Sequence, residues 1–175
     1  MASVAITHNL CLGNRVGGIP YAGGGEMISF TIYGNPVAQG RPRAFIPKSK
    51  TKVWTRPIVT DPPNAREWKQ LVKAQAALHR RTESGLIQGP IHLALEFYLM
   101  RPKSLPKKVK EHIKRPDLEN LSKAVVDALQ GIFFRDDSQI SLLLVSKTYC
   151  RDEVDPPRVV VAMESLDEGE NDGHK

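Results

Sequence analysis

Residues 115–147 read RPDLENLSKAVVDALQGIFFRDDSQISLLLVSK, and this stretch decides how the rest of the chain is interpreted. Pro116 interrupts any preceding element, and Asp117 is a favourable residue to begin a helix. Apolar residues then recur at three- and four-residue steps, which predicts a helix with one buried face that ends near Gly131. Residues 140–145 are apolar and branched, which predicts a buried strand. The order is therefore acids, helix, acids and strand.

Acidic residues flank the predicted helix at both ends. Asp117 and Glu119 lie in its first turn, and the Asp136–Asp137 pair precedes the strand. Because a helix and the next strand normally pack side by side, we expect the two acidic groups to converge on one point. Clustered carboxylates repel one another unless a cation is bound, and their hard oxygens suit Mg²⁺, with Mn²⁺ as a substitute. Lys123, on the same helix, fits phosphate chemistry, in which negative charge develops on oxygen.

A plainer interpretation of these acids stays open. An acid in the first helical turn stabilises the helix dipole, and Asp117 can serve as a cap alone. Asp136-Asp137-Ser138 is also ordinary turn chemistry. The residues alone therefore leave a metal site and a purely structural role as alternatives.

Two motifs carry a family resemblance. One runs Pro-Asp-x-acid-Asn-Leu-x-Lys-x-x-x-Asp-Ala-Leu over residues 116–129 and continues as Asp-Asp-x-Gln-Ile over residues 136–140. The other comprises Gly-Asn-Pro-Val at residues 34–37 and Gly-Arg-Pro-Arg at residues 40–43. Over roughly residues 28–163 the chain resembles the RusA-type Holliday junction resolvases.

The resemblance implies a metal-dependent, homodimeric endonuclease that resolves four-way (Holliday) DNA junctions in recombination and repair. It implies Mg²⁺ bound by Asp117, Glu119 and Asp137, with Asp136 the weaker candidate of its pair. Lys123 completes the implied catalytic set and would neutralise charge on the phosphate. Glu119 stands where the family usually has aspartate, so direct metal binding by this residue stays open.

Basic residues are expected to supply the DNA contacts. The net charge is +6, but residues 37–115 hold eighteen Lys or Arg against five Asp or Glu, whereas residues 152–175 hold two against eight. A basic middle with an acidic tail is common in proteins that bind polyanions, although solvated basic faces are also frequent. The residues expected at DNA are Arg41, Arg43, Lys48, Lys50, Lys52, Lys114 and Arg115.

The remaining periodicities predict a single α+β domain in which helices cover a mixed β-sheet. This is the fold class that the resemblance also implies. We expect strands at residues 28–33, 91–100, 140–145 and 157–163, a hairpin or a mobile loop over 44–55, a short helix near residue 105, and a helix over 65–81 with the buried stripe Trp68, Leu71, Val72, Gln75 and Leu78.

The ends of the chain differ in composition from its middle. We expect residues 1–26 to be a disordered extension, residues 27–166 to form the domain and residues 167–175 to be a disordered acidic tail. Cys11 and Cys150 make neither a disulfide framework nor a metal motif. Because no apolar run reaches membrane-span length and no signal pattern is visible, we expect a cytoplasmic protein with no membrane partner.

Two rival functions remain compatible with the sequence. A non-catalytic module of the same fold would bind junction DNA without cutting it in magnesium. A non-nuclease interaction protein, whose acids only cap and solubilise, would not bind junctions at moderate salt.

Overall fold

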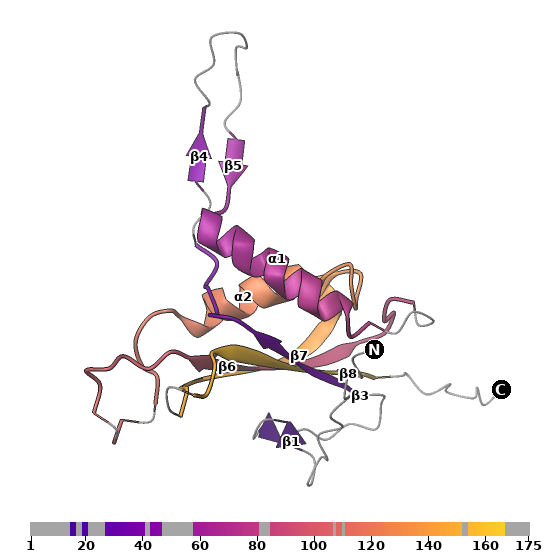
Figure 1. Cartoon of the computed structure of the whole chain (residues 1–175). Coiled ribbons are helices and arrows are strands. Elements are labelled where there is room, and N and C mark those ends of the chain that lie inside the picture. Colours follow the sequence, from indigo (N-terminus) through magenta and orange to yellow (C-terminus); the bar gives the residue numbers. More distant parts are fainter. Residues whose placement is uncertain are drawn as a thin grey trace, which may run out of the picture.

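The computed structural model describes residues 15–16, 19–20, 27–40, 43–46, 58–80, 85–106, 108–109, 111–151 and 154–166. In this part of the chain two helices lie over one face of a four-stranded sheet, as Figure 1 shows. This confirms the predicted α+β architecture. The elements are β1 (Arg15–Val16), β2 (Ile19–Pro20), β3 (Met27–Tyr33), β4 (Arg43–Phe45), β5 (Ile58–Thr60), α1 (Pro63–Ala77), β6 (Ile91–Leu99), α2 (Leu118–Leu129), a 3₁₀ turn (Asp137–Gln139), β7 (Ile140–Tyr149) and β8 (Arg158–Ser165).

The sheet has the strand order β3-β8-β6-β7. β8 pairs antiparallel with both β3 and β6, whereas β6 and β7 are parallel. A parallel pair needs a crossover between its strands, and the segment that contains α2 provides it. β3 and β7 are consequently the two edges of the sheet.

The core lies between the sheet and the two helices. β6 alternates strictly, so that Ile91, Leu93, Leu95 and Phe97 are fully buried while the residues between them are half-buried on the other face. This alternation is expected for a strand with one face against the core. α2 contributes the apolar stripe that its periodicity predicts: Leu121, Ala124, Val125, Ala128 and Leu129 are all fully buried.

α1 differs from its prediction at its C-terminal end. The helix stops at Ala77, and Leu78 beyond it is 82% exposed. Trp68 and Val72 are buried as predicted, but Leu71 is 38% exposed. Gln75 is only half-buried, because its amide bonds the backbone of β3. The predicted stripe was therefore too wide.

The other elements differ less from their predictions. The predicted hairpin is present as the antiparallel pair β4–β5, which projects beyond the start of α1 (Figure 1). Residues 103–105 form a turn in place of the predicted short helix. β1 and β2 pair antiparallel within the first 26 residues. The other residues of that segment, and residues 167–175, lie outside the described residues, so the predicted disorder at both ends stays a prediction. No described helix has the length and apolar character needed to cross a membrane.

The two edges of the sheet are finished differently. At β3, the Gln75 side chain of α1 accepts a hydrogen bond from the Tyr33 N–H (2.9 Å) and donates one to the Tyr33 carbonyl (2.8 Å). At β7, Leu142 and Leu143 are 38% and 42% exposed. A side chain thus occupies one edge at Tyr33, and the other edge presents apolar residues to solvent.

Candidate functional site

The start of α2 presents its acids to solvent. Asp117 has the extended backbone of an N-cap residue (φ −77°, ψ 146°), but its side chain makes no cap hydrogen bond to the described backbone. Its carboxylate and that of Glu119 are exposed, as is the Lys123 ammonium group one turn further along. Capping therefore does not occupy the Asp117 carboxylate, which stays available to a ligand.

Neighbouring segments hold this end of α2 in place. The Lys147 ammonium group, near the end of β7, donates hydrogen bonds to the carbonyls of Pro116 (2.7 Å) and Lys114 (2.8 Å). The Gln39 N–H donates to the Asn120 carbonyl (2.8 Å). These bonds fix the backbone on both sides of Asp117. Sequence reasoning assigned no role to Lys147 or Gln39.

The second acidic pair lies in the 3₁₀ turn before β7. Asp136 caps this turn, because its Oδ1 accepts a hydrogen bond from the Ser138 N–H (3.0 Å). Hydrogen bonds from Ser138 lower the pKa of the Asp136 carboxyl. Gln139 completes the turn by accepting bonds from the N–H groups of Arg135 and Asp136 at 2.9 and 3.1 Å. Asp136 thus has a structural task, which favours the exposed Asp137 as the candidate ligand of the pair.

Within the chain the two acidic groups do not converge as expected. The Lys147 contact places Asp117 beside the end of β7, whereas Asp137 lies directly before its start. α2 separates them too, since its twelve residues span about 18 Å. Among the described residues, no three His, Cys, Asp or Glu side chains lie close enough to hold one metal ion. The expectation failed because β7 runs back alongside α2 in the opposite direction. The end of β7, and not its start, therefore lies beside the start of α2.

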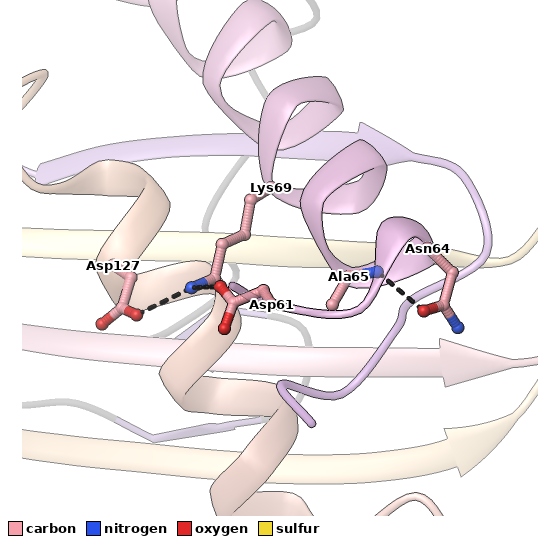
Figure 2. A network of polar contacts seen from close by, with 5 residues as sticks. All are labelled: Asp61, Asn64, Ala65, Lys69 and Asp127. Carbon is pink, nitrogen blue, oxygen red and sulfur yellow. Dashed lines mark hydrogen bonds and ion pairs between the residues drawn. The ribbon is translucent and has the colours of Figure 1, made fainter. Parts of the chain in front are cut away.

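Asp127 is engaged in a polar network that the sequence did not reveal. The Lys69 ammonium group of α1 bonds Asp127 on α2 (2.9 Å) and Asp61 at the base of the β4–β5 hairpin (3.0 Å), as Figure 2 shows. Burial by itself would lower the pKa of Lys69, but the hydrogen bonds and charges of Asp127 and Asp61 outweigh it and raise this pKa. The network ties the hairpin base to both helices. Its only sequence signal was the position of Asp127 off the apolar face of α2.

The predicted DNA-binding residues are only partly described. Lys114 and Arg115 are exposed directly before α2, next to the Asp117 end of the site. Arg43 begins β4, although its side chain is not described. The remaining predicted contacts lie outside the described residues: Arg41, Lys48, Lys50 and Lys52.

The carboxylates of the described residues do not make a complete magnesium site. Mg²⁺ requires near-octahedral oxygen coordination and is usually held by one or two carboxylates together with substrate phosphates and water. The Asp117 end offers two exposed carboxylates with Lys123 nearby, and the far end of α2 offers Asp137. A set that includes all three carboxylates is not assembled within one copy of the chain.

Comparison with known proteins identifies the kind of domain. The family described as endodeoxyribonuclease RusA matches residues 33–164, which include both acidic groups and both helices. The uncharacterized protein YqaN of Bacillus subtilis (strain 168) is 36% identical over 151 residues, covering 81% of this chain and 98% of YqaN.

Proposed function

Because the chain belongs to the RusA family of endodeoxyribonucleases, we propose that it is a magnesium-dependent, homodimeric resolvase of four-way DNA junctions. It would hydrolyse phosphodiester bonds in recombination and repair. The observation that carries the proposal is the exposed pair Asp117 and Glu119 at the anchored start of α2, within the matched region. Capping does not use the Asp117 carboxylate, which supports a role for this residue beyond that of a cap.

Each residue of the proposed site has a distinct role. Asp117, Glu119 and Asp137 are the proposed magnesium ligands, and Mn²⁺ is the proposed substitute. Lys123 lies four residues after Glu119 on α2, where its ammonium group would offset negative charge on the phosphate. Asp136 is the weaker candidate of its pair, because one of its carboxylate oxygens caps the 3₁₀ turn.

The DNA surface of the proposal is basic. Exposed Lys114 and Arg115 adjoin the start of α2, and the projecting β4–β5 hairpin belongs to the basic middle of the chain. Lys and Arg that neutralise phosphates release counterions, so junction affinity should fall steeply as salt rises. Arg41, Arg43, Lys48, Lys50 and Lys52 remain proposed contacts from this segment.

The alternative is a junction-binding module that does not cut. One observation favours it: the acids of a single described protomer form no three-residue metal group. A module of this kind would bind the junction with the same salt dependence but would leave it intact in magnesium.

One assay separates these functions. An end-labelled four-way junction and a linear duplex of the same arm sequence are incubated with the protein in Mg²⁺ or EDTA. We expect paired, symmetric nicks in the junction in Mg²⁺, no cleavage in EDTA, and an uncut duplex. Junction binding without nicking would establish the alternative, and the absence of both would remove both functions.

A further inference from the structure

We infer that the Ile113 side chain packs against the face of a nucleobase at the branch point of a bound four-way junction. This contact would favour junctions over linear duplex, which makes Ile113 a specificity-determining residue. Ile113 lies four residues before Asp117, in the segment that leads into the start of α2. The role rests on the proposed function, whose substrate recognition it refines.

Ile113 is among the most exposed apolar side chains of the described residues, with an exposed fraction of 86%. Single exposed apolar residues are common on protein surfaces and need no function by themselves. What distinguishes Ile113 is its setting. Its backbone is anchored, its surroundings are basic, and the proposed active site follows it directly in the chain.

The backbone is held on both sides of Ile113. Before it, the buried His112 places its ring 4.5 Å from the ring of Tyr149, measured between centroids. After it, the Lys147 ammonium group donates a hydrogen bond to the carbonyl of Lys114 (2.8 Å). Tyr149 and Lys147 both belong to the end of β7. Because the mounting is already ordered, Ile113 can present an apolar surface to a ligand with little further loss of backbone freedom.

The charge around Ile113 selects the kind of partner. Residues 101–115 hold seven Lys or Arg against a single acid, Glu111. Lys114 and Arg115 follow Ile113 directly, and both are exposed. Cations beside an exposed apolar side chain match a ligand that offers phosphates and flat apolar faces together. DNA has both, since each nucleotide carries a phosphate and a base.

A junction accommodates such a side chain more readily than a duplex does. Proteins that insert Ile, Leu, Met or Phe between base steps must unstack those bases. The cost of unstacking is least for a base that already lacks part of its normal pairing or stacking. Helical stacking is interrupted where the four arms of an open junction meet. Ile113 would therefore find an available base face at the branch point and not along a linear duplex.

The position of Ile113 also suits cleavage close to that point. Four residues span at most about 14 Å, so this is the greatest separation of Ile113 from Asp117 along the chain. One DNA strand advances about 3.4 Å per nucleotide. The base that contacts Ile113 would lie within about four nucleotides of the phosphate held at Asp117.

A fluorescent base analogue tests the contact without cleavage. A four-way junction carries 2-aminopurine, whose emission rises when it unstacks, at the branch point, and binding is followed in EDTA. We expect the parent to raise the emission of the bound junction, Ile113→Ala to lose most of this rise, and Ile113→Leu to keep it. Leu78→Ala is the matched control and should behave like the parent, because Leu78 is 82% exposed beyond the end of α1. A parent that binds without a rise, or an Ile113→Ala variant that keeps the full rise, would overturn the inference.

A charge variant separates the base contact from phosphate binding. Lys114→Gln should weaken the binding of junction and duplex alike and reduce the salt slope of binding by about 1. At saturating protein it should leave the emission of the bound junction unchanged. If Lys114→Gln removed the rise at saturation as fully as Ile113→Ala, the rise would report general phosphate binding and the inference would fail.

Nicking and sedimentation provide the last arms. In Mg²⁺, Ile113→Ala should nick the junction roughly tenfold more slowly than the parent. Its melting temperature and its binding of linear duplex should not change, because the side chain is exposed. A change in its sedimenting mass would instead make Ile113 a contact between protein chains and overturn the inference. A parent that raises the emission but nicks nothing would overturn the proposed cleavage and leave the branch-point contact standing.

Discussion

The two edges of the sheet solve the same problem in opposite ways. At β3, the outward backbone groups of Tyr33 are paired with the amide of Gln75, so that a helix side chain stands in for a missing strand. At β7, residues 140–146 keep an apolar edge, with Leu142 and Leu143 exposed. An unpaired edge invites other strands to add to it. The β3 edge is therefore occupied at Tyr33 by a side chain of α1, whereas the β7 edge keeps apolar residues exposed.

The largest expected effect concerns the residue just before the open edge. Asp137→Asn keeps the shape of the side chain but removes a charged oxygen ligand. We expect junction nicking to fall by roughly a hundredfold or more, while junction binding persists or tightens because less negative charge faces the phosphates. Rates and affinities on a labelled junction would measure this.

Asp136→Asn is the control for that variant. Asn keeps the side-chain oxygen that caps the 3₁₀ turn, so this change should alter both the melting temperature and the nicking rate only slightly. If both variants lose the same activity, the distinction between the two aspartates is wrong.

The next effect concerns Glu119, at the other end of the α2 crossover. Glu119→Gln should lose most of the nicking activity, and Glu119→Asp should keep a measurable part, because the family usually has aspartate here. Both variants should melt like the parent, since Glu119 is exposed. If Glu119→Gln cut as fast as the parent while Asp117→Asn was inactive, Glu119 would be a first-turn helix acid and not a ligand.

A smaller effect, on stability, is expected from the Lys69 network between α1 and α2. Lys69→Met leaves Asp61 and Asp127 without the ammonium group that they share. We expect the free energy of unfolding to fall by about 1–3 kcal/mol, measured by urea denaturation. Lys73→Met, on the same helix at an exposed position, should change it by less than about 0.5 kcal/mol. Equal effects would show that the Lys69 network contributes nothing specific.

The closed edge itself should yield a still smaller change. Gln75→Ala uncovers the Tyr33 N–H and carbonyl, which then bond water, so we expect a loss of about 1 kcal/mol. The exposed Gln70→Ala on the same helix is the control. The informative readout is sedimentation: if the uncovered β3 edge recruits another copy, Gln75→Ala will form species larger than the parent.

The smallest effect lies between the edges, at Glu96 on the central strand β6. Burial raises the pKa of Glu96, although the Tyr98 hydrogen bond and the Arg158 charge oppose this. A raised pKa in the folded state means that folding favours the protonated acid, so its contribution to stability is lost as pH rises through that pKa. Glu96→Gln should therefore melt higher than the parent at pH 7, with the difference shrinking towards pH 4. A constant difference across this range would exclude ionisation of Glu96 as its cause.

Much of the fold could be predicted because it depends on local periodicity. The alternation in β6 and the apolar stripe of α2 predicted both elements, and each is buried as its pattern requires. α1 was overextended because Leu71 and Leu78 fit a helical stripe, yet they are 38% and 82% exposed, and Leu78 lies beyond the end of the helix. Periodicity reports which residues can share a face, not how much of that face another layer will cover.

The site was harder to predict, because it depends on which end of β7 lies beside the start of α2. The residues at both ends of α2 were identified, but their expected convergence required Asp137 and Asp117 to lie at the same end of β7. Lys147 shows that they do not. Gln75, Lys69 and Lys147 act through partners 42, 58 and 31 residues away, which no local pattern reveals.

The position of β8 governs the order in which this sheet can assemble. β8 is the last strand of the sheet in sequence, yet it lies between β3, the first, and β6. During synthesis β3 must therefore wait for residues 158–165, while β6, α2 and β7 can already associate with one another. Such non-local closure slows folding and prolongs exposure of the unpaired side of β6.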